Sequence, residues 1–411
     1  MASRDLAKGA ALGASSATAL AVLLMRRYLR HELQTPLLVH SPLEERQEED
    51  RELLQDVKLL LRDYWPHPIL EFSGYISTGY SSLWAVMPSM HAVGHIEVLT
   101  LADGGTVSLH WYAPPQKDHK RVVLVLPGLN NDSRTSFVQS AMRHLRSEGF
   151  QAVALNYRGL AGLELMTPKV ASGDSFEDMP EVAAHMAKVC PDAELSAIGF
   201  SLGGGILLRH LGLEGSRTLF KSAVTVAAPV DFVKLTESLE SGPRRRFMNF
   251  MMTTGVKAFM LPELLRSKFR DRVKWRGVLT ATKIREIDEA VICPLHGHAT
   301  AWDFYKSCSP HSSLSKIAIP TLVVNAQDDP VVSFSSLPLE EMRRNPHLYV
   351  AITKRGGHIG WGSGGLGAGA WTDAMAAHFI QACSRSRQRA ADKFVSEAAS
   401  RAAMPTTPSR L

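Results

Sequence analysis

The sequence predicts an α/β fold built on a mostly parallel, doubly wound sheet, and three observations predict it. Short apolar runs that suit buried strands alternate with amphipathic helical stretches between residues 122 and 228. One of these strands, residues 193–200, passes directly into a glycine-rich helix through Gly199-Phe200-Ser201-Leu202-Gly203. The alternation stops at Pro229 and resumes near residue 320, which indicates an insertion over the strand ends, where ligands bind in such sheets.

The individual elements follow from the periodicity of the apolar residues. An amphipathic helix is expected around Leu53, Leu54, Val57, Leu60 and Leu61, because these residues recur at helical spacing. Two strands at 95–101 and 106–111 flank Asp103-Gly104-Gly105, which is a hairpin signal. The core elements expected next are strands 122–126, 152–156, 193–200, 222–228, 320–325 and 348–353, and helices 136–147, 176–189 and one from Leu202 onward.

The length and composition suit one large domain with attached segments. The chain has 411 residues, of which 45% are hydrophobic and 21% charged, as in an ordinary globular enzyme. The expected division is a membrane anchor or targeting segment at 1–35, a helical extension at 36–93, a core at 94–230 and 317–385, a helical lid insertion at 231–316, and a polar tail at 386–411 that is disordered or partly helical.

Charge and cysteine usage argue against several classes of function. The net charge of +6 is mild for this length, and no basic stripe interleaved with aromatics predicts nucleic-acid binding. The arginines at 244–246 are expected to be solvated rather than to face phospholipid headgroups. The four cysteines form no CxxC pair and are expected to be free thiols in a reducing compartment. There is no HExxH motif, so neither a metal nor a cofactor is predicted.

An uncharged N-terminal stretch, residues 9–25, is flanked on both sides by basic residues. As a helix it would be about 25 Å long, slightly short of a bilayer core. An uncleaved anchor, a cleaved signal peptide and an organellar targeting helix are all open. No small-residue cleavage site follows the apolar run, so we favour an anchor in the endoplasmic reticulum or another internal membrane, with the catalytic domain in the cytosol.

Ser201 is the predicted nucleophile. A GxSxG sequence at a strand-to-helix turn forms a tight elbow that exposes the serine hydroxyl at the end of the sheet. The small residues two positions before and after the serine let the strand and the helix approach closely. Gly204 and Gly205 extend this run beyond what helix propensity alone would select.

A serine hydroxyl needs a base to take its proton and a third group to orient that base. Asp328 and Asp329 follow a predicted strand, and His358 follows the last one after Gly356-Gly357. This is the order Ser, acid, His of the α/β-hydrolases. We favour Asp329 as the acid because it precedes the apolar run after Pro330, and expect Asp328 to support the turn. His358 is preferred to the lid histidines at 296, 298 and 311, which could instead line the pocket.

The oxyanion of a tetrahedral intermediate needs two preorganised donors. One is expected to be the backbone N–H of Leu202, which directly follows the nucleophile. The other is expected from the loop after strand 122–126, which contains Pro127-Gly128-Leu129-Asn130-Asn131. Leu129 is the candidate, because Gly128 lets the backbone turn inward.

These motifs resemble those of the α/β-hydrolase-domain esterases and lipases of the single-pass membrane type, over residues 95–379. The chain is similar to the yeast medium-chain fatty-acid ethyl ester synthase/esterases and to related bacterial and plant hydrolases. The resemblance rests on the sequences at 156–159 (NYRG), 283–290 (KIREIDEA), 293–297 (CPLHG), 328–330 (DDP) and 356–361 (GGHIGW). The oxyanion loop departs from the pattern, since it has Pro127 where the family usually has His before Gly.

The resemblance and the residues together predict a membrane-associated serine hydrolase of carboxylic esters, with fatty acyl lipids as the favoured substrates. Acyl transfer to an alcohol is the nearest alternative, because only the acceptor differs. A non-catalytic binding protein on the same fold and a peptidase are further alternatives. Apolar lid residues suit acyl chains, although a helix core would use the same residues: Phe247, Met248, Phe250, Met251, Met252, Phe259 and Met260.

Overall fold

The computed structural model describes residues 22, 34–42, 44, 48–67, 69–86, 94–113, 119–362 and 369–402. Nearly all of the predicted anchor (1–35) lies outside these residues. In the part of the chain that is described, no helix combines the length and the apolar character needed to cross a bilayer.

A single sheet of nine strands forms the centre of the molecule, in the order β1-β9-β8-β7-β6-β4-β5-β3-β2. The strands from β4 to β9 run parallel to one another, whereas β1, β3 and β2 add antiparallel edges. Their bounds are β1 (Leu37–Val39), β2 (His95–Thr100), β3 (Thr106–Trp111), β4 (Arg121–Leu126), β5 (Gln151–Asn156), β6 (Glu194–Phe200), β7 (Phe220–Val226), β8 (Thr321–Ala326) and β9 (Leu348–Thr353).

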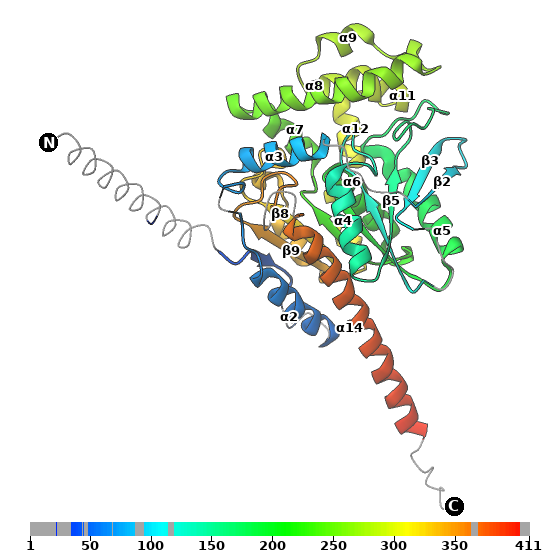
Figure 1. Ribbon diagram of the computed structural model, residues 1–411, viewed down its shortest axis with the longest axis vertical. Helices are drawn as coiled ribbons and strands as arrows, with labels where there is room; N and C mark the ends of the chain where they lie inside the picture. The colour runs from blue at the N-terminus through cyan, green and yellow to red at the C-terminus, as the bar shows by residue number, and fades with distance from the viewer. Residues whose placement is uncertain are drawn as a thin grey trace, which may run out of the picture.

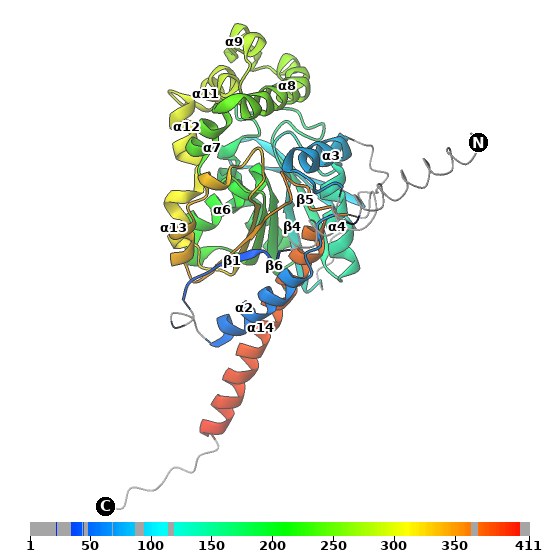
Figure 2. The same cartoon turned by 90° about the vertical axis from the view of Figure 1, so that its left-hand side faces the viewer.

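Helices cover both faces of this sheet and one end of it (Figures 1 and 2). Their bounds are α2 (Glu48–Arg62), α3 (Gly74–Val86), α4 (Ser136–Ser147), α5 (Met179–Val189), α6 (Leu202–Glu214), α7 (Phe232–Leu239), α8 (Gly242–Arg266), α9 (Trp275–Thr280), α10 (Ile284–Ile287), α11 (Cys293–His296), α12 (Ala301–Cys308), α13 (Leu339–Arg344) and α14 (Trp371–Ala402).

Alternation along the strands separates two apolar cores. Successive side chains of a strand point to opposite faces of a sheet. Leu124 of β4 therefore packs in a core with α5 and α6, while its neighbours Val123 and Val125 pack in another with α2, α4 and α14. Both faces are buried, which is why the central strands are continuous apolar runs, as parallel sheets require.

The predicted α/β architecture is confirmed, and most of the predicted strands and helices lie within two residues of their expected bounds. Helix 136–147 and strand 348–353 coincide with α4 and β9. The strand expected at 222–228 begins and ends two residues earlier, as β7. The helix expected at 176–189 was wrong in its first turn, because residues 173–178 form a 3-10 turn and α5 begins at Met179.

Among the described residues, the insertion between β7 and β8 contains helices and no strand. It contributes α7 to α12 and the 3-10 turn Pro310–Lys316. Figure 1 shows α8 and α9 above the sheet, at the end opposite the outer part of α14. Most of these helices share a third apolar core of their own, which includes Val278, Val291 and Phe304.

The N-terminal extension pairs with the central sheet and packs on α14, which the sequence did not indicate. The short strand β1, which the sequence analysis missed, pairs with β9, and α2 packs along α14. Leu53, Leu54, Val57 and Leu61 are buried on α2, and Leu60 is half-buried. The tail at 386–411 was expected to be disordered or partly helical; its residues 386–402 continue α14, and residues 403–411 lie outside the described part.

Candidate active site

Ser201 lies at a strained turn between β6 and α6. Its φ of 49° and ψ of −120° are unfavourable for a residue with a side chain. Hydrogen bonds hold this conformation, since Ser201 N–H donates to Val226 O at 2.9 Å and Gly204 N–H donates to Ser201 O at 2.9 Å. A Cβ on Gly199 would lie 2.6 Å from Gly203 O, so the close approach of strand and helix needs glycine there.

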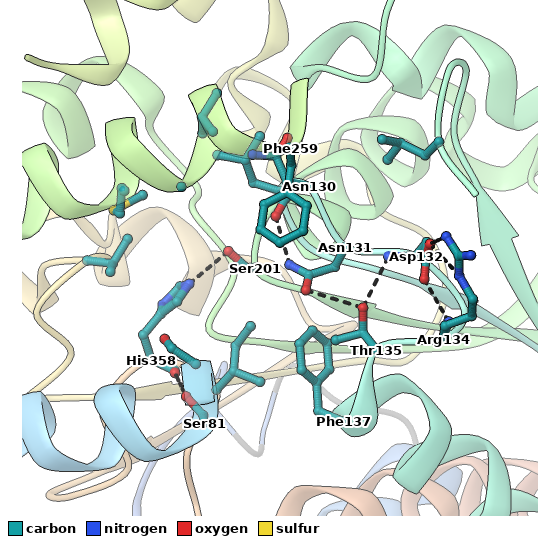
Figure 3. Close-up of a pocket in the computed structure, with 18 of the residues that line it drawn as sticks. Ser81, Asn130, Asn131, Asp132, Arg134, Thr135, Phe137, Ser201, Phe259 and His358 are labelled. Atoms are coloured by element: carbon teal, nitrogen blue, oxygen red, sulfur yellow. Dashed lines mark hydrogen bonds and ion pairs between the residues drawn. The ribbon is translucent and has the colours of Figure 1, made fainter. Parts of the chain in front are cut away.

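A chain of hydrogen bonds connects Ser201, His358 and Asp329. Ser201 Oγ lies 2.8 Å from His358 Nε2, and His358 Nδ1 lies 2.9 Å from Asp329 Oδ2 (Figure 3 shows the first of these bonds). The other oxygen, Asp329 Oδ1, accepts from the N–H groups of Val331 and Val332 at 2.7 and 2.9 Å. Asp329 is 2% exposed, so its carboxylate is fixed on both sides.

Asp328 points to a different part of the same turn. Its Oδ1 accepts from Gly357 N–H at 3.0 Å, and its Oδ2 lies 3.4 Å from Arg355 Nη1. Burial raises the pKa of Asp328. The structure therefore brings Asp329 to the imidazole and leaves Asp328 holding the loop that carries His358.

Helix α3 supports the His358 loop from outside the sheet, and the sequence analysis did not predict this. His358 N–H donates to Thr78 Oγ1 at 2.8 Å, and Ser81 Oγ donates to His358 O at 3.0 Å. Ser77 Oγ lies 3.0 Å from Gly356 O. The only signal in the sequence is the set of hydroxyl residues at helical spacing between 77 and 81.

A buried acid completes this support. Glu71 Oε1 accepts from Gly362 N–H at 2.8 Å and lies 3.0 Å from Ser77 Oγ. Glu71 Oε2 is buried and has no hydrogen-bond partner among the described residues. Burial raises the pKa of Glu71 to about 7, against the lowering effect of these two hydrogen bonds.

The two expected oxyanion donors lie beside Ser201. Leu202 begins α6, and N–H groups in the first turn of a helix have no partner within that helix. Leu129 follows Gly128, and a Cβ on Gly128 would lie 3.2 Å from Ser201 Cβ. Asn131 Nδ2 donates to Leu129 O at 2.7 Å, and Asn130 has a φ of 56°. The loop is therefore held in a tight turn against the nucleophile (Figure 3).

Two cavities meet at Ser201. The larger has a volume of about 810 Å³ and lies between α3 and α8, with His358, Leu129 and Phe259 in its wall. The smaller, of about 110 Å³, extends under the lid among Leu202, Met252, Met260 and other apolar side chains. A hydroxyl that opens onto an apolar space under the lid suits a substrate with an apolar chain.

The lid histidines do not face the nucleophile. His296 and His298 lie against the buried Asp174, with His298 Nε2 2.6 Å from Asp174 Oδ2. His311 does not line either cavity. The pKa of Asp174 is lowered, because its contacts with His296 and His298 outweigh the raising effect of burial.

Arg158, in the NYRG sequence, forms ion pairs with Asp178 and Asp103 and does not contact Ser201. Its guanidinium bonds Asp178 at 2.6 Å and Asp103 at 2.8 Å, which ties the end of β5 to the turn before α5 and to the β2–β3 hairpin. The side chains of Arg158 and Asp178 are 6% and 5% exposed, so this is a buried ion pair.

One group of side chains in the described part has the composition of a metal site. His144, Glu148 and His378 offer ligand atoms within 4.8 Å of one another. They lie between α4 and α14, on the face of the sheet covered by these helices, and none of them lines the two cavities at Ser201. The absence of a metal or cofactor from the reaction stays a prediction from the sequence.

The chain is similar to several known proteins. Phospholipase ABHD3 of Bos taurus is 33% identical over 272 residues, which are 64% of this chain and 66% of the relative. Human monoacylglycerol lipase ABHD2 is 26% identical over 333 residues, which are 77% of this chain and 78% of the relative. An esterase structure from Pyrococcus furiosus aligns with a TM-score of 0.43 and 16% identity, over 64% of this chain and 83% of that one.

The chain therefore spans just under two thirds of the length of the ABHD3 relatives. A family model described as the alpha/beta hydrolase fold matches residues 121–360, which is more than half of the sequence. Ser201, Asp329 and His358 all fall within that match. The chain belongs to the alpha/beta hydrolase fold family.

Proposed function

We propose that this protein is a serine hydrolase of carboxylic esters whose preferred substrates carry fatty acyl chains. One observation supports this most directly: the hydrogen-bonded series Ser201, His358 and Asp329 lies where a large cavity of mixed polarity meets a smaller, mainly apolar one. The names of the ABHD3 and ABHD2 relatives, a phospholipase and a monoacylglycerol lipase, support a lipid ester.

The proposed reaction begins with proton transfer from Ser201 Oγ to His358 Nε2 as Oγ attacks the ester carbonyl. Asp329 stabilises the imidazolium, and the N–H groups of Leu202 and Leu129 hold the oxyanion. The C–O bond to the alcohol then breaks, and His358 returns the proton to the leaving oxygen. Water, activated by the same imidazole, attacks the acyl-enzyme and releases the fatty acid and the free serine.

We also propose that residues 9–25 attach the enzyme to a membrane, as in the single-pass esterases that the sequence resembles. Support comes from the uncharged stretch itself and from its basic flanks. This arrangement would keep the catalytic domain at the surface from which its lipid substrates come. It is tested by carbonate extraction of cell membranes. A protein released by carbonate would contradict the anchor.

A fluorophosphonate probe tests the nucleophile. We expect the wild-type protein to be labelled and Ser201→Ala to remain unlabelled, because only an activated serine attacks the probe. A series of esters of increasing acyl length, with and without added alcohols, then separates hydrolysis from acyl transfer. Free acid as the main product in the presence of alcohol supports the hydrolase. A transferred ester as the main product would support the acyltransferase instead.

A further inference from the structure

Helix α8 has one buried face and, opposite it, an exposed apolar face. Asn249, Thr253, Val256 and Leu264 are buried on the inner face. At about 100° per residue, Phe247, Phe250, Met251 and Leu265 fall together on the opposite face. Their side chains are 62%, 47%, 51% and 55% exposed. Phe247, Phe250 and Met251 were expected to contact acyl chains or to form a helix core, and these three line neither cavity and lie outside the lid core.

The same segment carries a concentrated positive charge. Residues 242–280, from the start of α8 to the end of α9, contain ten lysines and arginines and two acidic residues, a net charge of +8. The whole chain has a net charge of +6, so the rest of it is slightly negative. Within the described structure, the two acids of this segment each contact a single arginine, Glu263 with Arg266 and Asp271 with Arg270.

This exposed face borders the entrance to the catalytic cavity. Met248 and Met252 of α8 line the larger cavity, and Phe259 both lines it and is 57% exposed. Figure 3 shows Phe259 on α8 above Asn130, on the side of the cavity opposite Phe137. Helix α3 forms the other side of the entrance, and its Ile76 and Leu83 are 46% and 65% exposed.

From this geometry we propose that the outer face of residues 242–280, called here the lid face, docks onto the surface of a membrane that contains anionic lipids. Exposed aromatic and aliphatic side chains beside arginines and lysines are typical of helices that lie in the lipid headgroup region. The apolar stripe enters the acyl boundary, while the cations contact anionic headgroups. The lid face thereby places the cavity entrance against the layer that holds the substrate.

A lipid surface explains both properties of the lid face better than solvent or a protein partner. A solvated surface does not need four large apolar side chains grouped on one helix face. A protein partner would have to be both acidic and apolar and sit at the mouth of the cavity, where it would obstruct substrate entry. An anionic lipid layer supplies both contacts and the substrate together.

The proposed function supplies the reason for docking, but the docking itself can be tested without it, because lipid binding and catalysis are measured separately.

The first experiment uses the full chain with Ser201→Ala, so that vesicle lipids are not consumed. All four native cysteines are buried, so a cysteine introduced at the surface can be labelled selectively. Phe250→Cys reports on the lid face. Val98→Cys is the matched control, because Val98 is 56% exposed on β2, far from the cavity.

An environment-sensitive fluorophore is attached at each position, and vesicles of phosphatidylcholine with phosphatidylserine are added. We expect a blue shift at position 250 and none at 98, and a smaller shift at 250 with phosphatidylcholine alone. The N-terminal segment is present in both proteins and so does not create this difference. No shift at 250, or an equal shift at both positions, would overturn the proposal.

The charge contribution is tested with Arg244→Gln/Arg246→Gln in the Phe250→Cys background. Each basic residue near an anionic surface changes binding about fivefold, so the pair is expected to lower the ratio of docked to undocked lid face, read from the blue shift at position 250, by roughly 25-fold. Arg343→Gln/Arg344→Gln on α13 is the control and is expected to behave as the parent, since both residues are exposed away from the lid. Equal binding by the two variants would contradict a role for the lid cations.

Hydrolysis assays separate a failure of docking from a failure of catalysis. Phe247→Ser/Phe250→Ser, with Ser201 intact, is expected to hydrolyse a soluble short-chain ester at the wild-type rate and a vesicle-borne ester at least tenfold more slowly. Equal rates on vesicles would overturn the docking even if the enzyme is active. A shift at position 250 in a protein with no ester activity would sustain the docking and refute the proposed function.

Discussion

Gly128 faces Ser201 so closely that a Cβ on residue 128 would lie 3.2 Å from Ser201 Cβ. Few side-chain contacts are that short, so the loop that carries Leu129 would have to move by a few tenths of an ångström to admit a methyl group. The glycine thus sets the separation between the nucleophile and the proposed oxyanion donor, and it does so without a positive φ.

We expect Gly128→Ala to lower kcat for ester hydrolysis about tenfold, because small displacements of catalytic groups have large effects on rate. The melting temperature should change little, since residues 129–131 of the loop are only half-buried and can shift. Gly79→Ala on α3 is the control, because a Cβ there meets nothing within 4 Å. A Gly128→Ala enzyme with the wild-type kcat would show that the Leu129 N–H does not need this position.

The two neighbouring aspartates are expected to differ sharply. Asp329→Asn should lower kcat by roughly 10⁴-fold, because an amide facing Nδ1 favours the wrong imidazole tautomer. Asp328→Asn should cost less than tenfold, because its carbonyl oxygen can still accept from Gly357 N–H. Steady-state kinetics on a soluble ester measures both. Comparable losses in the two variants would reverse the assignment of the acid.

Glu71 should make stability depend on pH. Its pKa is about 7 in the folded protein, against 4.5 for an ordinary glutamate, so the folded state binds more protons between these values. The free energy of unfolding therefore falls as the pH rises from about 4.5 to 7, by on the order of 3 kcal/mol in total. The loss is complete above pH 7.

Glu71→Gln removes this titration. We expect the variant to be more stable than the wild type at pH 8 and nearly equal to it at pH 4.5, by urea denaturation at each pH. Glu340→Gln, an exposed residue of α13, is the control and should show no such pH-dependent difference. A Glu71→Gln protein that follows the wild-type profile throughout would mean that Glu71 is not protonated in the fold.

The buried pair Arg158 and Asp178 should be costly to break. Arg158→Leu is expected to destabilise the fold by about 3–5 kcal/mol, since it leaves Asp178 buried without its partner. Burial already raises the pKa of Asp178, and Arg158 opposes that effect. The double variant Arg158→Leu/Asp178→Leu should recover part of the loss in thermal denaturation. A double variant less stable than Arg158→Leu would contradict this, and would mean that Asp178 stabilises the fold even without Arg158.

The sequence was sufficient for the elements whose pattern is local. The apolar runs of β4 and β9 and the turn at Ser201 each follow from residues that are close together in the chain. The order of Ser201, Asp329 and His358 adds a constraint that few unrelated sequences meet, which is why the three can be proposed together from the sequence.

Features that depend on distant contacts were not predictable in this way. Thr78 and Ser81 reach His358 across about 280 residues, and nothing in the composition of α3 identifies its target.

Residues 386–402, the C-terminal half of α14, were expected to be disordered or partly helical, because their sequence is polar and alanine-rich. Alanine is a strong helix former, and α14 begins in a well-packed segment from which a helix extends at little further cost.

The support of His358 by α3 means that the working unit is larger than the stretch that defines the family. The family match begins at residue 121, yet the loop of the proposed base is held by groups at 71–81. A fragment that starts at residue 94 would keep Ser201, Asp329 and His358, and Asp328 would still hold Gly357, but the His358 loop would lose its hydrogen bonds to Thr78 and Ser81. Exchanging residues 71–81 for those of a relative should therefore change how His358 is held.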